Sequence, residues 1–117
     1  MSDAVTIQNA FARRAYPATV PASGSISGTV DIGGVTLTGL VTPGTLTNGT
    51  LYFRVSVDGQ TYAPLYNPFG SRVQVLLGSS RAYPLDPTDF LSWQYVALET
   101  PTNEAAARVI MLVGRGI

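Results

Sequence analysis

Two carboxylates, Asp86 and Asp89, form the pair in this sequence whose spacing could serve acid–base chemistry. Such catalysis needs a proton donor and a proton acceptor held close to the reacting group. The same Asp-Pro-Thr-Asp segment is also typical of a helix start, because Asp caps a helix and Pro suits its first position. We therefore predict one short helical turn near residues 86–91, with the two carboxylates at its start.

Asp58 is a possible calcium ligand in a loop, but its neighbours Gly59 and Gln60 bring no second acidic group. Calcium requires several oxygen ligands, so a turn role for Asp58 is the better interpretation. The chain has no His and no Cys. This removes the commonest general base and the thiolate ligands of metals. We expect no catalytic residues, no cofactor and no metal site, and a protein that is not an enzyme.

Aromatic side chains are a further candidate site, because they could stack on sugars. The residues concerned are Tyr52, Tyr62, Tyr66, Tyr83, Trp93 and Tyr95. Aromatic residues make up 9% of the chain, an ordinary share, and most of them are expected to serve the core. Carbohydrate binding therefore remains an alternative function.

The first 20 residues carry a candidate protein interface, formed by Phe11, Arg13, Arg14 and Tyr16. Arginine and aromatic residues are enriched at the centres of protein interfaces. The alternative is a solvated Arg pair on a mobile arm. Pro17 makes this part of the chain extended. We predict an N-terminal arm over residues 1–20 and one folded domain over residues 21–117.

The charge content narrows the range of partners. The formal net charge is zero, so the overall positive charge of a nucleic-acid-binding protein is missing. No apolar run reaches the roughly 18 residues typical of a spanning helix, and the start of the chain has no signal-peptide pattern. We expect no nucleic-acid partner, no membrane segment, and a product made in a cytoplasm.

The segment over residues 51–66 predicts the fold most directly. Apolar and polar residues alternate from Leu51 to Asp58, as on a half-buried strand. Asp58 and Gly59 are a strong hairpin signal, and a second extended run follows. Pro64 in that run cannot donate to a ladder of hydrogen bonds, so its strand should lie at an edge or carry a bulge.

Further short strands are predicted along the chain, with turn signals every 8 to 12 residues. The segment 93–98 is expected to be a central strand, and 109–113 a last strand buried on both faces. About eight strands in all are typical of an all-β antiparallel sandwich. Charged residues are only 12% of the chain, about half the usual share. An uncharged β surface can pack against copies of itself, so we expect a symmetric oligomer, with a trimer favoured.

The order of several segments resembles a family of small structural proteins encoded by tailed bacteriophages and prophages. The matching segments cover about residues 23–113. They are 25–34 (SISGTVDIGG), 37–40 (LTGL) with Pro43, 51–59 (LYFRVSVDG), 62–67 (YAPLYN), 83–85 (YPL), 93–98 (WQYVAL) and 104–113 (EAAARVIMLV).

This resemblance implies a jelly-roll β-sandwich distantly similar to discoidin or galactose-binding domains. It also implies a non-enzymatic component of the virion. The leading expectation is a capsid decoration (cement) protein that binds the major capsid protein on the capsid surface. The alternative is a carbohydrate-binding module of a tail fibre, baseplate or head fibre.

Overall fold

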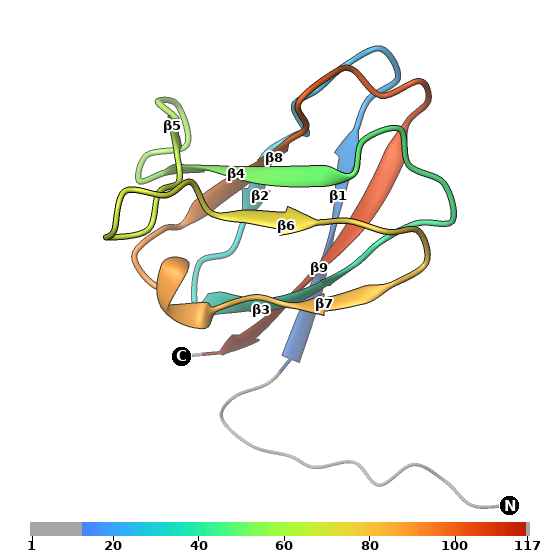
Figure 1. Ribbon diagram of the computed structural model, residues 1–117. Helices are drawn as coiled ribbons and strands as arrows, with labels where there is room; N and C mark the ends of the chain where they lie inside the picture. The colour runs from blue at the N-terminus through green and yellow to red at the C-terminus, as the bar shows by residue number, and fades with distance from the viewer. Residues whose placement is uncertain (1–12, 117) are drawn as a thin grey trace, which may run out of the picture.

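The computed structural model describes residues 13–116, which form two facing antiparallel sheets (Figure 1). Sheet A has the strand order β1-β9-β3-β7, and sheet B has the order β2-β8-β4-β5, with β6 also paired to β4. The strands are β1 (Arg13–Val20), β2 (Val30–Asp31), β3 (Val35–Val41), β4 (Thr50–Ser56), β5 (Ala63–Pro64), β6 (Gln74–Leu76), β7 (Ala82–Pro84), β8 (Tyr95–Glu99) and β9 (Arg108–Gly116). Over these residues the one helical element is a 3₁₀ turn, η1 (Pro87–Asp89), and no helix is long enough to cross a membrane.

The strand pairing is nested around the middle of the chain. β1 pairs with β9, β2 with β8, β3 with β7, and β4 with β6. The chain therefore resembles one long hairpin that has been rolled up, so that successive pairs fall alternately in sheets A and B. This is the topology of a jelly roll, and the predicted all-β jelly-roll sandwich is confirmed.

The predicted hairpin over residues 51–66 is present as β4 and β5. Leu51, Phe53 and Val55 are buried, and Tyr52 and Arg54 are only partly covered. The predicted alternation fails after Val55, because Ser56 is buried and Val57 is 68% exposed. Arg54 lies opposite Pro64 in the register, so the proline is in an edge strand as its missing N–H requires. Gly59 has φ of +80°, a conformation that favours glycine.

The predicted helical turn is confirmed as η1. The Asp86 carboxylate accepts a hydrogen bond from the Thr88 backbone N–H at 3.1 Å and another from the Thr88 hydroxyl at 2.7 Å. Pro87 occupies the start of the turn. The turn ends at Phe90, which is its C-cap. The Phe90 side chain is fully buried and packs edge to face on Phe53, with the ring centres 5.1 Å apart. The turn therefore fixes a large core side chain between the two sheets.

The predicted boundary at residue 20 is wrong for residues 13–20. This segment is β1, and it pairs along its whole length with β9, from Arg13 opposite Arg115 to Val20 opposite Arg108. Ala18 and Val20 are buried in the core. Within the described residues the sandwich domain thus begins at residue 13, and the predicted arm retains only residues outside the described part.

The prediction that residues 109–113 are buried on both faces is also wrong. Ile110 and Leu112 are buried, but Val109 is 45% exposed, and Met111 and Val113 are only partly covered. β9 does lie in the centre of sheet A, between β1 and β3. Its second apolar row faces outward, because no further layer covers sheet A in the described part of the chain.

Candidate functional site

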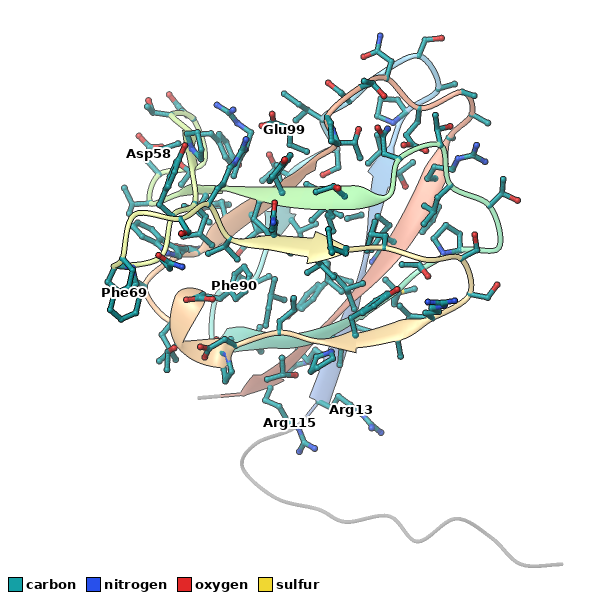
Figure 2. All side chains as sticks on the ribbon, in the orientation of Figure 1. Arg13, Asp58, Phe69, Phe90, Glu99 and Arg115 are labelled. Atoms are coloured by element: carbon teal, nitrogen blue, oxygen red, sulfur yellow. The ribbon has the colours of Figure 1, made fainter. Side chains whose placement is uncertain are left out.

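The three predicted interface residues that the structure describes lie in different surroundings. Arg13 projects from the start of β1 in Figure 2, near Arg115 at the end of β9. Arg14 is also exposed, but Tyr16 is partly buried and packs against the core. Phe11 lies outside the described residues. The interface role of all four residues therefore stays a prediction, and Tyr16 also packs against the core.

The outer surface of sheet A, which we name face A, is almost free of charge. In an antiparallel sheet, directly opposite residues share a face. One cross-strand row consists of Pro17, Met111, Val41 and Ala82, and the adjacent row of Ala15, Val113, Gly39 and Pro84. Neither row contains a polar side chain.

The charges of face A lie at one end. Arg13 and Arg115 form the next row along β1 and β9. At the other end, Thr19 lies opposite Val109. Among residues 13–116, no carboxylate lies in these rows. Face A is therefore an apolar surface with a positively charged margin.

The outer surface of sheet B, face B, carries charges that are already paired. The Glu99 carboxylate accepts from Arg54 at 3.1 Å and from Arg72 at 2.9 Å. The Arg72 guanidinium also lies 4.4 Å from the centre of the Tyr52 ring, a cation–π distance. The hydrogen bond from Arg72 is the main cause that holds the pKa of Glu99 below its usual value, against the opposing effect of burial. Covering face B would desolvate this network.

The free edges of the sheets are closed to strand addition. Pro17 in β1, Pro64 in β5 and Pro84 in β7 each lie in an edge strand. The neighbouring backbone hydrogen bonds show that each proline nitrogen faces the open edge. In β1, the Thr19 carbonyl accepts from the Gly28 N–H and not from β9, and Pro17 points the same way as Thr19. After Pro64 and Pro84, the next N–H donates to the neighbouring strand of the sheet. β2 and β6, with two and three residues, are too short to offer a long edge.

The residues after Pro64 and Pro84 donate hydrogen bonds to the neighbouring strands. The Leu65 N–H donates to the Phe53 carbonyl in β4, and the Leu85 N–H donates to the Thr38 carbonyl in β3. Successive residues of a strand point their backbone N–H and C=O groups to opposite sides of the strand. The backbone groups of the residue before each donor therefore point away from the partner strand. A proline at that position removes an edge donor without removing a ladder bond.

The predicted sugar-stacking set is scattered. Tyr52 lies under Arg72, the Tyr62 hydroxyl is 2.7 Å from that of Thr29, and the Tyr83 hydroxyl accepts from the Gly78 N–H at 2.7 Å. The Tyr95 ring packs on Gly59. Tyr66 is 56% exposed. These aromatic side chains therefore mostly serve packing, and they do not share one platform.

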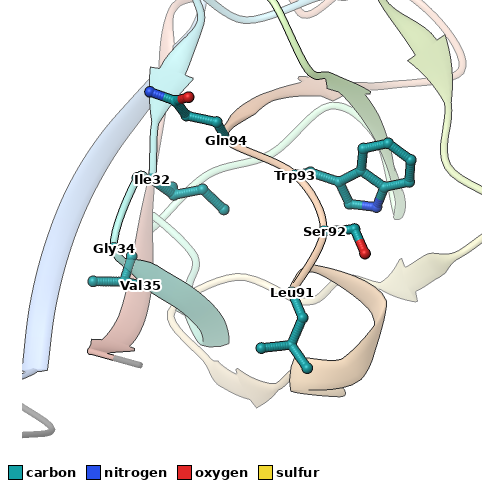
Figure 3. Close-up of a pocket in the computed structure, with 8 residues that line it drawn as sticks. Ile32, Gly34, Val35, Leu91, Ser92, Trp93 and Gln94 are labelled. Atoms are coloured by element: carbon teal, nitrogen blue, oxygen red, sulfur yellow. The ribbon is translucent and has the colours of Figure 1, made fainter.

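An open hollow of about 210 Å³ lies between residues 32–35 and residues 91–94. Figure 3 shows that the side chains of Ser92 and Trp93 point away from Ile32 across this hollow. Trp93 packs against the core instead. The hollow therefore offers mainly backbone and aliphatic groups, rather than an aromatic stacking surface.

Phe69 was missed by sequence reasoning, and it is the most exposed large apolar residue described, at 91%. It occupies a tight turn in which the Asn67 side chain accepts from the N–H groups of Phe69 and Ser71 at 2.9 and 3.0 Å. Gly70 completes the turn with φ of +89°. The turn holds the ring out from the body of the protein, where Figure 2 shows it.

The carboxylate of Asp58 has a structural role. Asp58 accepts from the backbone N–H groups of Thr61 and Gln60 and from the Ser56 hydroxyl, and these bonds lower its pKa to about 2. The predicted turn role of Asp58 is thus confirmed. Over residues 13–116 no group of three or more His, Cys, Asp or Glu side chains could hold a metal ion.

Glu104 is a second residue that sequence reasoning missed. Its side chain is almost fully buried, and its carboxylate accepts from the backbone N–H groups of Thr47 and Asn48 at 2.9 and 3.1 Å. It also pairs with Arg108 at 3.1 Å and bonds to the Asn48 amide. Burial raises the pKa of Glu104, but these bonds outweigh it, so the pKa lies below its usual value. The carboxylate ties two loops together at one end of the sandwich.

Comparison with known proteins adds no relative. No family model matches the sequence, and no curated protein matches it.

Proposed function

We propose that this protein is a non-enzymatic structural component of a tailed-bacteriophage virion that decorates the capsid. It would bind the major capsid protein on the outside of the head and stabilise the shell. A homo-oligomer, with a trimer as its stoichiometry, would sit over a junction between capsid subunits. Many modest contacts then act together through avidity.

The observation that carries this proposal is the ordered set of segments that resembles phage structural proteins. Those segments overlap every strand of the jelly roll except β1 and β6, and the sandwich has closed edges and one outer face with charges only at its margin. A sandwich of this kind suits a rigid building block, because it can bury a face without burying unpaired charge. The carboxylates of Asp58, Glu99 and Glu104 each hold loops or strands together, which also favours a structural function.

The test is to locate the protein in intact particles. Purified virions would be examined by mass spectrometry, and a reconstruction of the head would be searched for density that fits the sandwich. Undecorated heads would then be mixed with purified protein, and binding followed by sedimentation. Absence of the protein from purified particles would refute the virion role. Presence on the tail alone would refute the decoration role.

A second candidate is a carbohydrate-binding module on a tail fibre, baseplate or head fibre. The observation that favours it is the pair of exposed aromatic rings, Tyr66 and Phe69, which are close in sequence around one ordered turn. Aromatic faces exposed in this way can stack on sugars. A glycan array with Tyr66→Ala and Phe69→Ala tests this, and Leu76→Ala, at a residue 69% exposed, is the control. Absence of any binding by the unmodified protein excludes this candidate.

A further inference from the structure

We infer that copies of this chain associate through face A, with the rows centred on Met111 and Val113 turned toward the symmetry axis. The inference rests on the oligomer proposed above, but it does not depend on the virion role. Three features of the molecule support it: the edges of the sheets are closed, face B is unfavourable to cover, and face A approaches the size of a small interface.

The closed edges exclude the simplest route to a β-sheet oligomer. Two sandwiches can join by pairing edge strands, but this needs a row of free backbone donors and acceptors. Pro17 interrupts that row in β1, and Pro84 interrupts it in β7. Pro64 does the same in β5 of sheet B. Copies that associate must therefore use faces or loops.

The two faces differ in the cost of covering them. On face B, a second copy would remove water from the Arg54–Glu99–Arg72 network, and the desolvation of paired charges often exceeds their attraction. On face A, two complete cross-strand rows carry only apolar side chains or glycine. Arg13 and Arg115 lie at the margin, where an interface rim is normally polar and hydrated.

The size of face A is close to the lower limit for a specific contact. Strands rise about 3.3 Å per residue and lie about 4.8 Å apart, so the four strands of sheet A cover roughly 450 Å². Two such faces bury about 900 Å² in total, slightly below the roughly 1,000 Å² at which specific interfaces begin, so the contact is expected to be weak. The association should therefore depend on concentration. Val41 and Val109, 42% and 45% exposed, would lose that exposure on contact.

Sedimentation velocity of the full chain, from micromolar to millimolar concentrations, tests the inference directly. Met111→Arg places a charge at the centre of face A, and Leu76→Arg places the same charge on the exposed surface of sheet B. We expect association of the unmodified protein and of Leu76→Arg, and at least about tenfold weaker association of Met111→Arg, because an unpaired charge would be buried. Val109→Arg, at a more exposed position, should act in the same direction. Circular dichroism and thermal unfolding verify that each variant folds.

Four results would overturn the inference. The first is a protein that stays monomeric at every concentration. The second is that Met111→Arg and Val109→Arg fold and associate like the unmodified chain, and the third is that Leu76→Arg alone loses association. The fourth is association only after residues 1–12 are deleted. The last result would mean that the chain's own N-terminal residues cover face A. The first also removes the proposed oligomer, whereas the second and third leave it intact, and none of the four bears on the presence of the protein in virions.

Discussion

Arg13 and Arg115 lie directly opposite each other in the register of β1 and β9. Like charges placed opposite each other in an antiparallel pair are destabilising, and opposite charges contribute roughly 0.2–1 kcal/mol. Taken alone, this pair is therefore unfavourable for the pairing of β1 and β9. Each of the other pairs along the two strands has at most one charged member.

The first prediction reverses one of these charges. Arg13→Glu should increase the free energy of unfolding by about 0.5 kcal/mol, because Glu then faces Arg115. Urea denaturation followed by circular dichroism measures this change. The double variant Arg13→Glu, Arg115→Glu restores a like-charge pair and should lose the gain. Equal stability of the single and double variants would contradict the prediction.

The second prediction concerns the buried carboxylate of Glu104. Glu104→Ala should lower the free energy of unfolding by about 3–5 kcal/mol, because it leaves Arg108 and two loop N–H groups without their partner. Glu104→Gln, which keeps an acceptor, should cost less. Glu99→Ala is the matched control on face B, and a loss of about 1 kcal/mol or less is expected there. A Glu104→Ala variant as stable as the control would exclude this role.

The third prediction concerns pH. The folded-state pKa values of Glu99 and Glu104 are lowered, and that of Asp58 is lowered to about 2. Groups with lowered pKa values stabilise the fold above their unfolded-state pKa, and they lose this contribution as the pH falls through the folded-state value. The free energy of unfolding should therefore decline between about pH 5 and about pH 2. Asp89, whose pKa is raised by burial and by Asp86, acts in the opposite sense.

Glu104→Gln isolates one part of this pH dependence. The variant lacks the ionisable group, so its stability should fall less steeply with acid than that of the unmodified protein. Chemical denaturation at several pH values gives both slopes. Parallel curves would show that Glu104 does not contribute.

The fourth prediction concerns the start of the chain. Deletion of residues 1–20 removes β1, exposes the edge of β9, and takes Ala18 and Val20 out of the core. We expect this protein to lose cooperative unfolding or to aggregate. Deletion of residues 1–12 leaves every described contact in place and should preserve cooperative unfolding. Thermal unfolding of both truncated chains decides the matter, and a stable fold in the shorter chain would contradict the assignment of β1.

The fifth prediction concerns the edge prolines. Replacing Pro17, Pro64 and Pro84 together with Thr restores the N–H donors at the free edges. We expect greater aggregation at high protein concentration, because exposed β edges template the pairing of other chains. Light scattering over time measures it. Replacing Pro43 and Pro101, which lie outside the strands, is the control and should leave the aggregation rate unchanged.

Much of the sandwich was predictable from local pattern. The alternation from Leu51 to Asp58 predicted β4, and the Asp58-Gly59 turn predicted its hairpin. The position of Pro64 predicted an edge strand. Each of these features depends on a few neighbouring residues, so one sequence is enough to recognise it.

The features that failed depend on distant partners. β1 was missed because Pro17 and two adjacent arginines hide its alternation, which becomes clear only when β9 lies beside it. Glu104 looks like a surface residue of a polar loop, since Thr47 and Asn48 are more than fifty residues away in the chain. Face A was missed because the continuous apolar run 109–113 has the same sequence pattern in a strand buried on both faces and in a strand with one apolar face left uncovered.

The nested strand pairing also determines at which stage of folding face A forms. β4 and β6 close a short loop, whereas β1 and β9 join residues about a hundred positions apart, and the entropy of closing a loop grows with its length. Assembly should thus proceed from the central hairpin outward, at the slow rates typical of topologies with distant contacts. Face A is built on the pair that closes last. A chain still emerging from the ribosome therefore cannot present this surface, and the contact between copies that we infer would be deferred until each one is fully folded.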